Sequence, residues 1–226
     1  MARIFCIPGI IFLLCALVLS ILVTISLPFL PALDFVRVHF GSGVATTGQG
    51  MTELRFGIWA PCTYDNEGTR SCLKASVAYL VSISNEAKTA NVVIGSSWTR
   101  GLAVHPVATA VTFIAFLLSF STHHMVTLAA SLVSFLAALL TLIAFAIDIA
   151  LFAFVHHEIK KLPDVNGKTT TSAAFWMTFV TFILLLLAGC TVCFGRRRDR
   201  MSGAAAYPMS STSRPSFLSR FRRNKI

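Results

Sequence analysis

The chain has 226 residues, of which 55% are hydrophobic and only 12% are charged, and its formal net charge is +10. A soluble domain usually carries about 25% charged residues, so this composition excludes a protein with an ordinary water-facing surface. It is typical of a protein that is dissolved largely in lipid.

Four apolar stretches are long enough to cross a bilayer, which takes about 20 residues. The first is longer than the apolar region of a secretory signal peptide, about 7–15 residues, so we interpret it as an uncleaved anchor. As a helix that rises 1.5 Å per residue, the third stretch is longer than the roughly 30 Å hydrocarbon core is thick. We therefore expect it to tilt or to project beyond the leaflet. The expected spans are 4–30, 102–121, 126–155 and 173–194.

Basic residues are concentrated after the fourth span, where the tail 195–226 holds nine of them and a single acid. Lys and Arg next to a span stay on the cytoplasmic side. We therefore predict that residues 1–3, the turn 122–125 and the tail are cytoplasmic, and that the loops 31–101 and 156–172 lie outside. Three lysines in the second outer loop oppose this orientation, but the tail carries more charge.

The end of the fourth span combines thiols with basic residues. Cys190 and Cys193 are candidates for S-palmitoylation because they are juxtamembrane; plain packing is the alternative. The tail has little apolar content, so we expect it to be disordered and to attract anionic lipid at about 1 kcal/mol per basic residue near the surface. The alternative is a stop-transfer signal that only sets orientation. The arginines assigned to this lipid-facing surface are Arg196, Arg197, Arg198, Arg200, Arg220, Arg222 and Arg223.

The long loop 31–101 has the pattern of a small antiparallel sheet. Residues 34–40 alternate with period two, which is typical of a strand. A second strand is expected over 54–59 and one or two more over 71–83. Residues 85–94 are expected to form a short helix.

Cys62 and Cys72 are the two cysteines of this polar loop, whereas the other four lie in apolar stretches. Such a pair suggests a disulfide, and a disulfide suggests an oxidising compartment. The charge pattern places the loop outside without using the cysteines, so the two arguments are independent. Because the bridged segment is short, the expected constraint on the unfolded chain is about 3 kcal/mol.

Asp148 is the one carboxylate well inside a predicted span. Ionisable residues in that position are costly and usually face a partner inside the protein. We predict that Asp148 pairs with His105 or Arg100, at the outer end of the second span. The pair is interpreted as a hydrogen bond that locks two spans together; a proton-responsive pair is the alternative, because histidine titrates near neutrality.

Three motifs together resemble the fungal SUR/PalI family of plasma-membrane tetraspans, over nearly the whole chain. They are Gly57-Ile58-Trp59 followed by Cys62 and Cys72, the run from His105 to Ala108, and the run from Ile147 to Phe152. The loop motif also resembles that of claudins. The resemblance implies an all-α transmembrane four-helix bundle with a small disulfide-stapled antiparallel β-sheet in the first extracellular loop. Trp59 is then expected at the membrane interface under the sheet, with a partner contact as the alternative.

The resemblance also implies a non-catalytic role. PalI-type members assist a receptor of ambient-pH signalling, SUR-type members organise cortical membrane domains, and claudin-like adhesion is a third possibility. The sequence has no enzyme motif and no pattern for a cofactor, metal or nucleic acid, and Asp148 alone offers no ion path for transport. Expected partners are membrane lipids and another plasma-membrane protein, with a homo-oligomer as a further option.

Overall fold

A computed structural model of the chain describes residues 3–41, 44–46, 49–85, 91–121, 124–161 and 166–205. Side chains are described within 8–41, 51–84, 91–121, 125–161 and 166–191.

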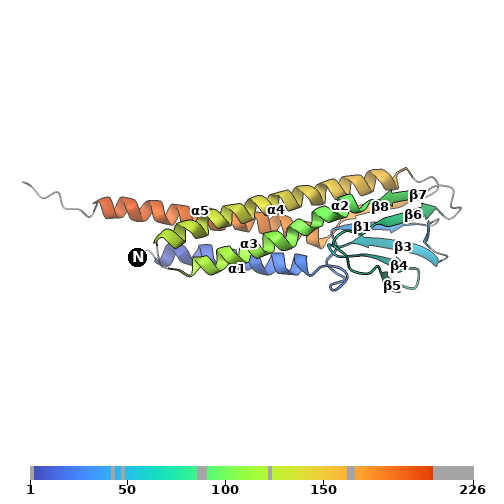
Figure 1. Cartoon of the computed structure of the whole chain (residues 1–226), viewed down its shortest axis with the longest axis horizontal. Helices are drawn as coiled ribbons and strands as arrows, with labels where there is room; N and C mark the ends of the chain where they lie inside the picture. Colours follow the sequence, from blue (N-terminus) through green and yellow to red (C-terminus); the bar gives the residue numbers. More distant parts are fainter. Residues whose placement is uncertain are drawn as a thin grey trace, which may run out of the picture.

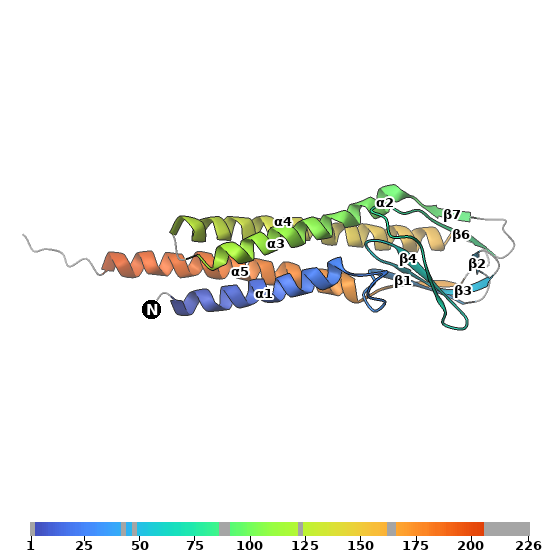
Figure 2. The same ribbon diagram turned by 60° about the horizontal axis from the view of Figure 1, so that its bottom comes forward.

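Four long helices lie side by side, and an antiparallel sheet covers one end of them (Figures 1 and 2). Helix α1 contacts α3 and α5, and α4 contacts the same two helices. The described N-terminal end of α1 and the C-terminal end of α5 lie at the end opposite the sheet. The helices are α1 (Arg3–Thr24), α2 (Ser96–Arg100), α3 (Val104–Ser119), α4 (His124–Ile159) and α5 (Ala173–Ala205), with a 3₁₀ turn η1 (Gly101–Ala103) between α2 and α3.

The helices meet through small side chains and expose large apolar ones. Small residues let helix backbones approach closely in lipid, whereas large apolar residues such as Leu132, Leu139 and Phe120 are more than half exposed. Three stretches of the described chain are long and apolar enough to cross a membrane, namely Ser96–Ser119, Met125–Ile159 and Ala173–Thr191, and Pro8–Thr24 is a shorter apolar helix. The buried contacts between helices include Leu13, Ala16, Ala115, Ala137, Ala138, Leu185 and Ala188.

The helix ends differ from the predicted spans. Helix α1 ends at Thr24 rather than at residue 30, because a turn leads into Pro28, whose nitrogen cannot donate a helical hydrogen bond. Helix α4 begins and ends outside the predicted span 126–155 and projects into the sheet. Helix α5 continues to Ala205, so the first part of the predicted disordered tail is helical.

The sheet has eight strands, and all of its pairings are antiparallel. The order is β5-β4-β3-β2-β6-β7, while β1 pairs with β3 and with β8. Strand β8 comes from the loop between α4 and α5, so both loops on this side build one sheet. The strands are β1 (Val36–Phe40), β2 (Val44–Thr46), β3 (Gln49–Phe56), β4 (Pro61–Asp65), β5 (Arg70–Cys72), β6 (Val81–Asn85), β7 (Asn91–Ile94) and β8 (Gly167–Thr171).

One face of the sheet packs on the projecting end of α4. Leu151, Val155 and Ile159 of α4 are fully buried there. The sheet contributes side chains at alternate positions, as the period of a strand requires. They include Val36, Val38, Phe40, Leu54 and Phe56.

One prediction for the loop is wrong, and another is confirmed in part. Residues 85–94 were expected to form a helix, but Val81–Asn85 and Asn91–Ile94 pair as antiparallel strands. Asn91–Ile94 has alternating exposed and buried residues, so Val92 and Ile94 pack against the core and Val93 points away from it. Over 71–83, where one or two strands are predicted, the structure has two: β5 ends at Cys72 and β6 begins at Val81, and the residues between them are not in a strand.

Candidate functional site

The candidate site is the junction where the sheet meets the helices. The motif Gly57-Ile58-Trp59 connects β3 to β4 at this junction. The indole Nε1 of Trp59 donates a hydrogen bond of 2.8 Å to the carbonyl oxygen of Thr24, and the backbone N–H of Ile58 donates one of 3.2 Å to Ser26 Oγ. The last carbonyls of a helix have no partner within it. The motif therefore caps α1 and attaches the sheet to it.

Gly57 is needed because the chain after α1 passes directly over it. A Cβ at this position would collide with Leu27 Cβ and would lie 2.9 Å from the Leu27 carbonyl oxygen. The Gly57 carbonyl in turn accepts a hydrogen bond of 2.6 Å from Tyr79 Oη. Burial raises the pKa of Tyr79 well above its ordinary value, so the phenol keeps its proton and remains a donor.

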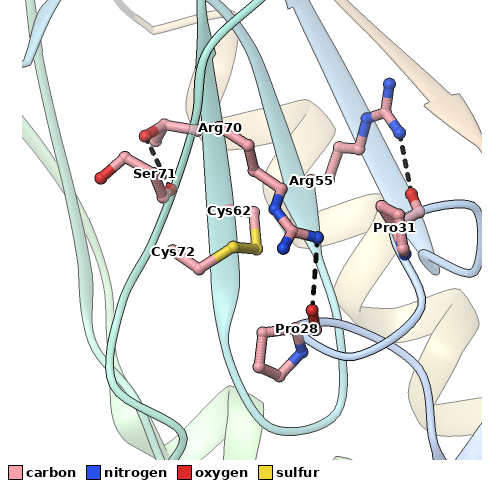
Figure 3. The surroundings of a disulfide bond; sticks show 8 residues. Pro28, Pro31, Arg55, Cys62, Arg70, Ser71 and Cys72 are labelled. Atoms are coloured by element: carbon pink, nitrogen blue, oxygen red, sulfur yellow. Dashed lines mark hydrogen bonds between the residues drawn. A yellow bond between two sulfur atoms is a disulfide. The ribbon is translucent and has the colours of Figure 1, made fainter.

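The predicted disulfide between Cys62 and Cys72 is present and joins β4 to β5. The two cysteines are directly opposite each other in the antiparallel register. Two arginines, Arg55 on β3 and Arg70 on β5, reach the segment after α1, as Figure 3 shows. Arg55 donates a hydrogen bond of 2.9 Å to the Pro31 carbonyl, and Arg70 donates one of 3.3 Å to the Pro28 carbonyl.

Thr24 connects this junction to the interior of the helices. Its Oγ1 lies 2.8 Å from Thr109 Oγ1 on α3, at hydrogen-bond distance. Thr109 Oγ1 also lies within hydrogen-bond distance of two carbonyl oxygens, those of Ser20 at 3.3 Å and His105 at 3.0 Å. Trp59, Thr24 and Thr109 therefore form a chain of contacts from the sheet through α1 to α3.

The structure brings His105 of α3 and Asp148 of α4 together. Nε2 of His105 lies 3.1 Å from Oδ1 of Asp148, and both residues are buried. The ring of Phe35, just before β1, lies 4.9 Å from the imidazole centroid. Arg100, the other partner considered for Asp148, is exposed on α2. The pair thus joins two helices directly beneath the sheet.

A small cavity lies next to this pair, with about 10 Å³ of space for the centre of a water molecule. That is room for at most about one water. Hydroxyl groups from all four long helices face it, although most of them already bond the carbonyl one turn before. The polar residues that line it are Ser20, His105, Thr109, Thr141, Thr178 and Thr181.

A charged network covers the face of the sheet that points away from the core. Buried Asp34 accepts two hydrogen bonds from Arg37 and one of 2.8 Å from Ser172 Oγ, just before α5. These bonds to Asp34 raise the pKa of Arg37, which stays charged. Glu53 lies 3.1 Å from Arg37 and 3.0 Å from Arg55. The network ties β1, β3 and the start of α5 together.

A sequence model described as the SUR7/PalI family matches residues 5–190, which is most of the chain. The chain belongs to the SUR7/PalI family. No curated protein matches it. The matched region includes the junction, the disulfide and the His105–Asp148 pair. Together with the apolar helices, membership of this family indicates a membrane protein.

Several residues of this SUR7/PalI junction were not predicted from sequence. They are Thr24, Asp34, Phe35, Thr109 and Ser172, which act through contacts between distant parts of the chain. The one available signal was the recurrence of Ser and Thr within apolar spans, where a hydroxyl needs a partner.

The predicted lipid-facing residues of this SUR7/PalI chain are only partly described. Cys190 is a half-buried free thiol about midway along α5, and its palmitoylation remains a prediction. The side chains of Cys193, Arg196, Arg197, Arg198 and Arg200 lie outside the described ones, as do residues Arg220, Arg222 and Arg223 altogether. Within the described part of the chain, no group of three or more His, Cys, Asp or Glu residues could hold a metal ion.

Proposed function

We propose that the chain is a non-catalytic accessory or scaffold tetraspan of the plasma membrane that acts through lateral contacts. In this arrangement the four long helices form a transmembrane bundle with both termini in the cytoplasm. The sheet then lies outside, in a claudin-like layout. Family membership, the apolar helices and the disulfide support this arrangement, because a disulfide persists in an oxidising compartment.

The observation that carries the proposal is the rigid attachment of the sheet to the helices. Trp59 bonds the end of α1, Phe35 contacts His105 on α3, and Ile159 of α4 is buried under the strands. A partner that binds the sheet therefore contacts a surface fixed relative to the membrane. A preformed surface of this kind loses little conformational freedom on binding.

The charged face is the part of the sheet best suited to a protein partner. Exposed His39 lies 3.9 Å from Glu53, at the edge of the Arg37–Glu53–Arg55 network. Charged groups arranged in this way give an interface its specificity and orientation. The partner that fits is another membrane protein with a complementary polar surface next to the bilayer.

Two roles within the family fit this surface. PalI-like assistance to an ambient-pH receptor requires a lasting contact with one partner, and we place it first. A SUR-type organiser of cortical domains, which affects the cell wall and endocytosis, requires many copies in one patch. Claudin-like adhesion would require a partner on an opposing membrane.

A photo-crosslinking residue at His39 of the full-length protein in its own cells tests the lateral contact. The same residue at Leu132, exposed on α4, is the matched control for random membrane collisions. We expect His39 to capture a defined membrane protein of the same cell and Leu132 not to do so. Equal patterns at both positions would contradict the proposal.

Imaging and growth of cells that lack the protein separate the three roles. Diffuse surface staining with lost growth at alkaline pH supports pH signalling, and immobile cortical patches support the organiser. Enrichment at cell contacts supports adhesion. Normal growth, wall and endocytosis with uniform staining would overturn all three.

A further inference from the structure

The segment 73–80, between β5 and β6, returns from the sheet to the helices without forming a strand (Figure 2). We call it the return segment. The N–H of Ser76 donates a hydrogen bond of 2.8 Å to the Trp59 carbonyl, and Tyr79 exchanges hydrogen bonds with Thr99 through its N–H and carbonyl. Since the Trp59 indole bonds Thr24, the return segment lies level with the end of α1.

The return segment exposes apolar side chains at this level. Leu73, Val77 and Leu80 are 53%, 52% and 54% exposed. Phe29, after α1, and Trp98, on α2, are exposed as well, at 66% and 40%. A cluster of exposed large apolar side chains on a folded protein marks a surface that meets another molecule or a membrane.

This apolar surface continues that of the helices. Ile25, next to the end of α1, and Val107, in the first turn of α3, are exposed like the other apolar residues of these helices. Exposed apolar side chains are therefore present on both the helices and the return segment. No polar band in α1 separates the lipid-covered part of the helices from the return segment. Lipid can therefore extend from the helices to this segment.

The charges around the return segment favour lipid as the occupant. Arg70, Lys74 and Arg100 are exposed, and neither 70–84 nor 91–104 contains an Asp or Glu. Apolar side chains at the boundary of headgroups and acyl chains, with Lys and Arg beside them, are typical of interfacial membrane contacts. Cations near the surface are attracted to anionic headgroups.

We propose that the return segment, with Phe29 and Trp98, inserts into the leaflet on the sheet side and anchors the sheet to lipid. The apolar side chains reach the upper acyl region, and the three cations face lipid phosphates. The proposal goes beyond the function proposed above and requires neither a given orientation nor a protein partner. Its failure would leave that function untouched.

Spin labelling of the full chain in vesicles tests it. The four cysteines outside the disulfide are replaced by serine, and single cysteines are introduced by Val77→Cys or Leu80→Cys. Leu132→Cys on α4 provides a lipid reference, and Glu67→Cys in the β4–β5 turn an aqueous one. The vesicles are phosphatidylcholine with a minor fraction of phosphatidylserine, and collisions with oxygen and with a nickel chelate are measured.

We expect spin labels at positions 77 and 80 to collide more often with oxygen than with the nickel chelate, like the label at position 132. We expect the label at position 67 to show the reverse. Water-like values at 77 and 80 would overturn the proposal. Dipolar broadening at 77 that grows with the ratio of protein to lipid would also overturn it, because a second copy would then cover the segment. Hydroxyl-radical footprinting of the unmodified chain in the same vesicles gives a test that does not depend on the folding of variants. We expect residues 73–80 to be labelled less than residues 65–69. Equal labelling of the two segments would contradict insertion.

Discussion

The indole nitrogen of Trp59 donates a hydrogen bond of 2.8 Å to the carbonyl oxygen of Thr24, the last residue of α1. The bond joins the only tryptophan of the strand-forming loop 31–95 to the end of the first helix. It explains why a Trp follows the Gly57 turn: an indole is large enough to fill the junction and carries a donor at its edge.

Trp59→Phe keeps most of the ring but removes the donor. The Thr24 carbonyl then loses its partner in a part-buried position, which costs about 1–3 kcal/mol. We expect a lower apparent melting temperature for the purified protein in detergent, measured by size-exclusion thermostability. Trp176→Phe is the matched control, because Trp176 is exposed on α5 and its replacement should change little. Equal shifts for both variants would contradict the role of the bond.

Gly57→Ala introduces a Cβ that collides with Leu27. Overpacking of this kind costs about 1–3 kcal/mol, and the chain after α1 must move away from the sheet. We expect reduced thermostability and faster proteolysis of the loop. Gly95→Ala is the control, since its Cβ would meet nothing closer than Ser97 Oγ at 3.7 Å. If both variants are as stable as the wild type, the close approach of Gly57 to Leu27 does not contribute to stability.

The His105–Asp148 pair is expected to behave as a coupled unit. Removing one member of a buried hydrogen-bonded pair leaves the other without a partner, which costs about 1–3 kcal/mol or more, whereas replacing both with apolar residues can be nearly neutral. We therefore expect each single variant, Asp148→Leu or His105→Leu, to be less stable than the double variant that carries both substitutions. Ser134→Ala on the same helix is the control, because no partner for its hydroxyl is found among the described residues. Additive losses would show that the two side chains act independently.

Cys62→Ser removes the link between β4 and β5. The loss of constraint on the unfolded chain is about 3 kcal/mol, which is large for a sheet of short strands. We expect the variant to be held in the secretory pathway, as measured by surface biotinylation of intact cells. Cys15→Ser, at a free and exposed cysteine, should reach the surface normally. Normal delivery of the Cys62 variant would contradict the prediction.

Tyr79 should make stability depend on alkaline pH. The folded chain holds the phenol proton more tightly, because burial raises the pKa of Tyr79. Above the ordinary tyrosine value of about 10, the unfolded chain loses this proton first, so the free energy of unfolding falls as the pH rises. Melting temperatures at increasing pH should fall less steeply for Tyr79→Phe than for the wild type. An unchanged slope in Tyr79→Phe would contradict the prediction.

The helices and β1 could be read from sequence because their patterns are local. Long apolar stretches require a membrane, and the alternation from Asp34 to Phe40 has the period of a strand. The disulfide followed from the isolation of Cys62 and Cys72 in a polar loop. Asp148 could be identified because a lone carboxylate in an apolar span needs a partner, and His105 was within reach.

The remaining contacts depend on tertiary structure. Strand β8 is a short polar run. It is held in an extended conformation by pairing with the edge of β1. Asn91–Ile94 was mistaken for helix because its buried positions, Val92 and Ile94, alternate over only four residues. The hydrogen bond from Trp59 to Thr24 spans 35 positions, and no local pattern indicates it.

The pairing of β1 with β8 orders events during synthesis. Arg37 of β1 and Ser172, just after β8, are 135 positions apart in sequence. While the ribosome makes α2, α3 and α4, one edge of β1 therefore stays open, and an unpaired edge can pair with other strands. That edge closes only when the residues just before the last helix emerge. Completion of the sheet thus requires synthesis as far as β8, and a product truncated before β8 keeps this edge of β1 unpaired.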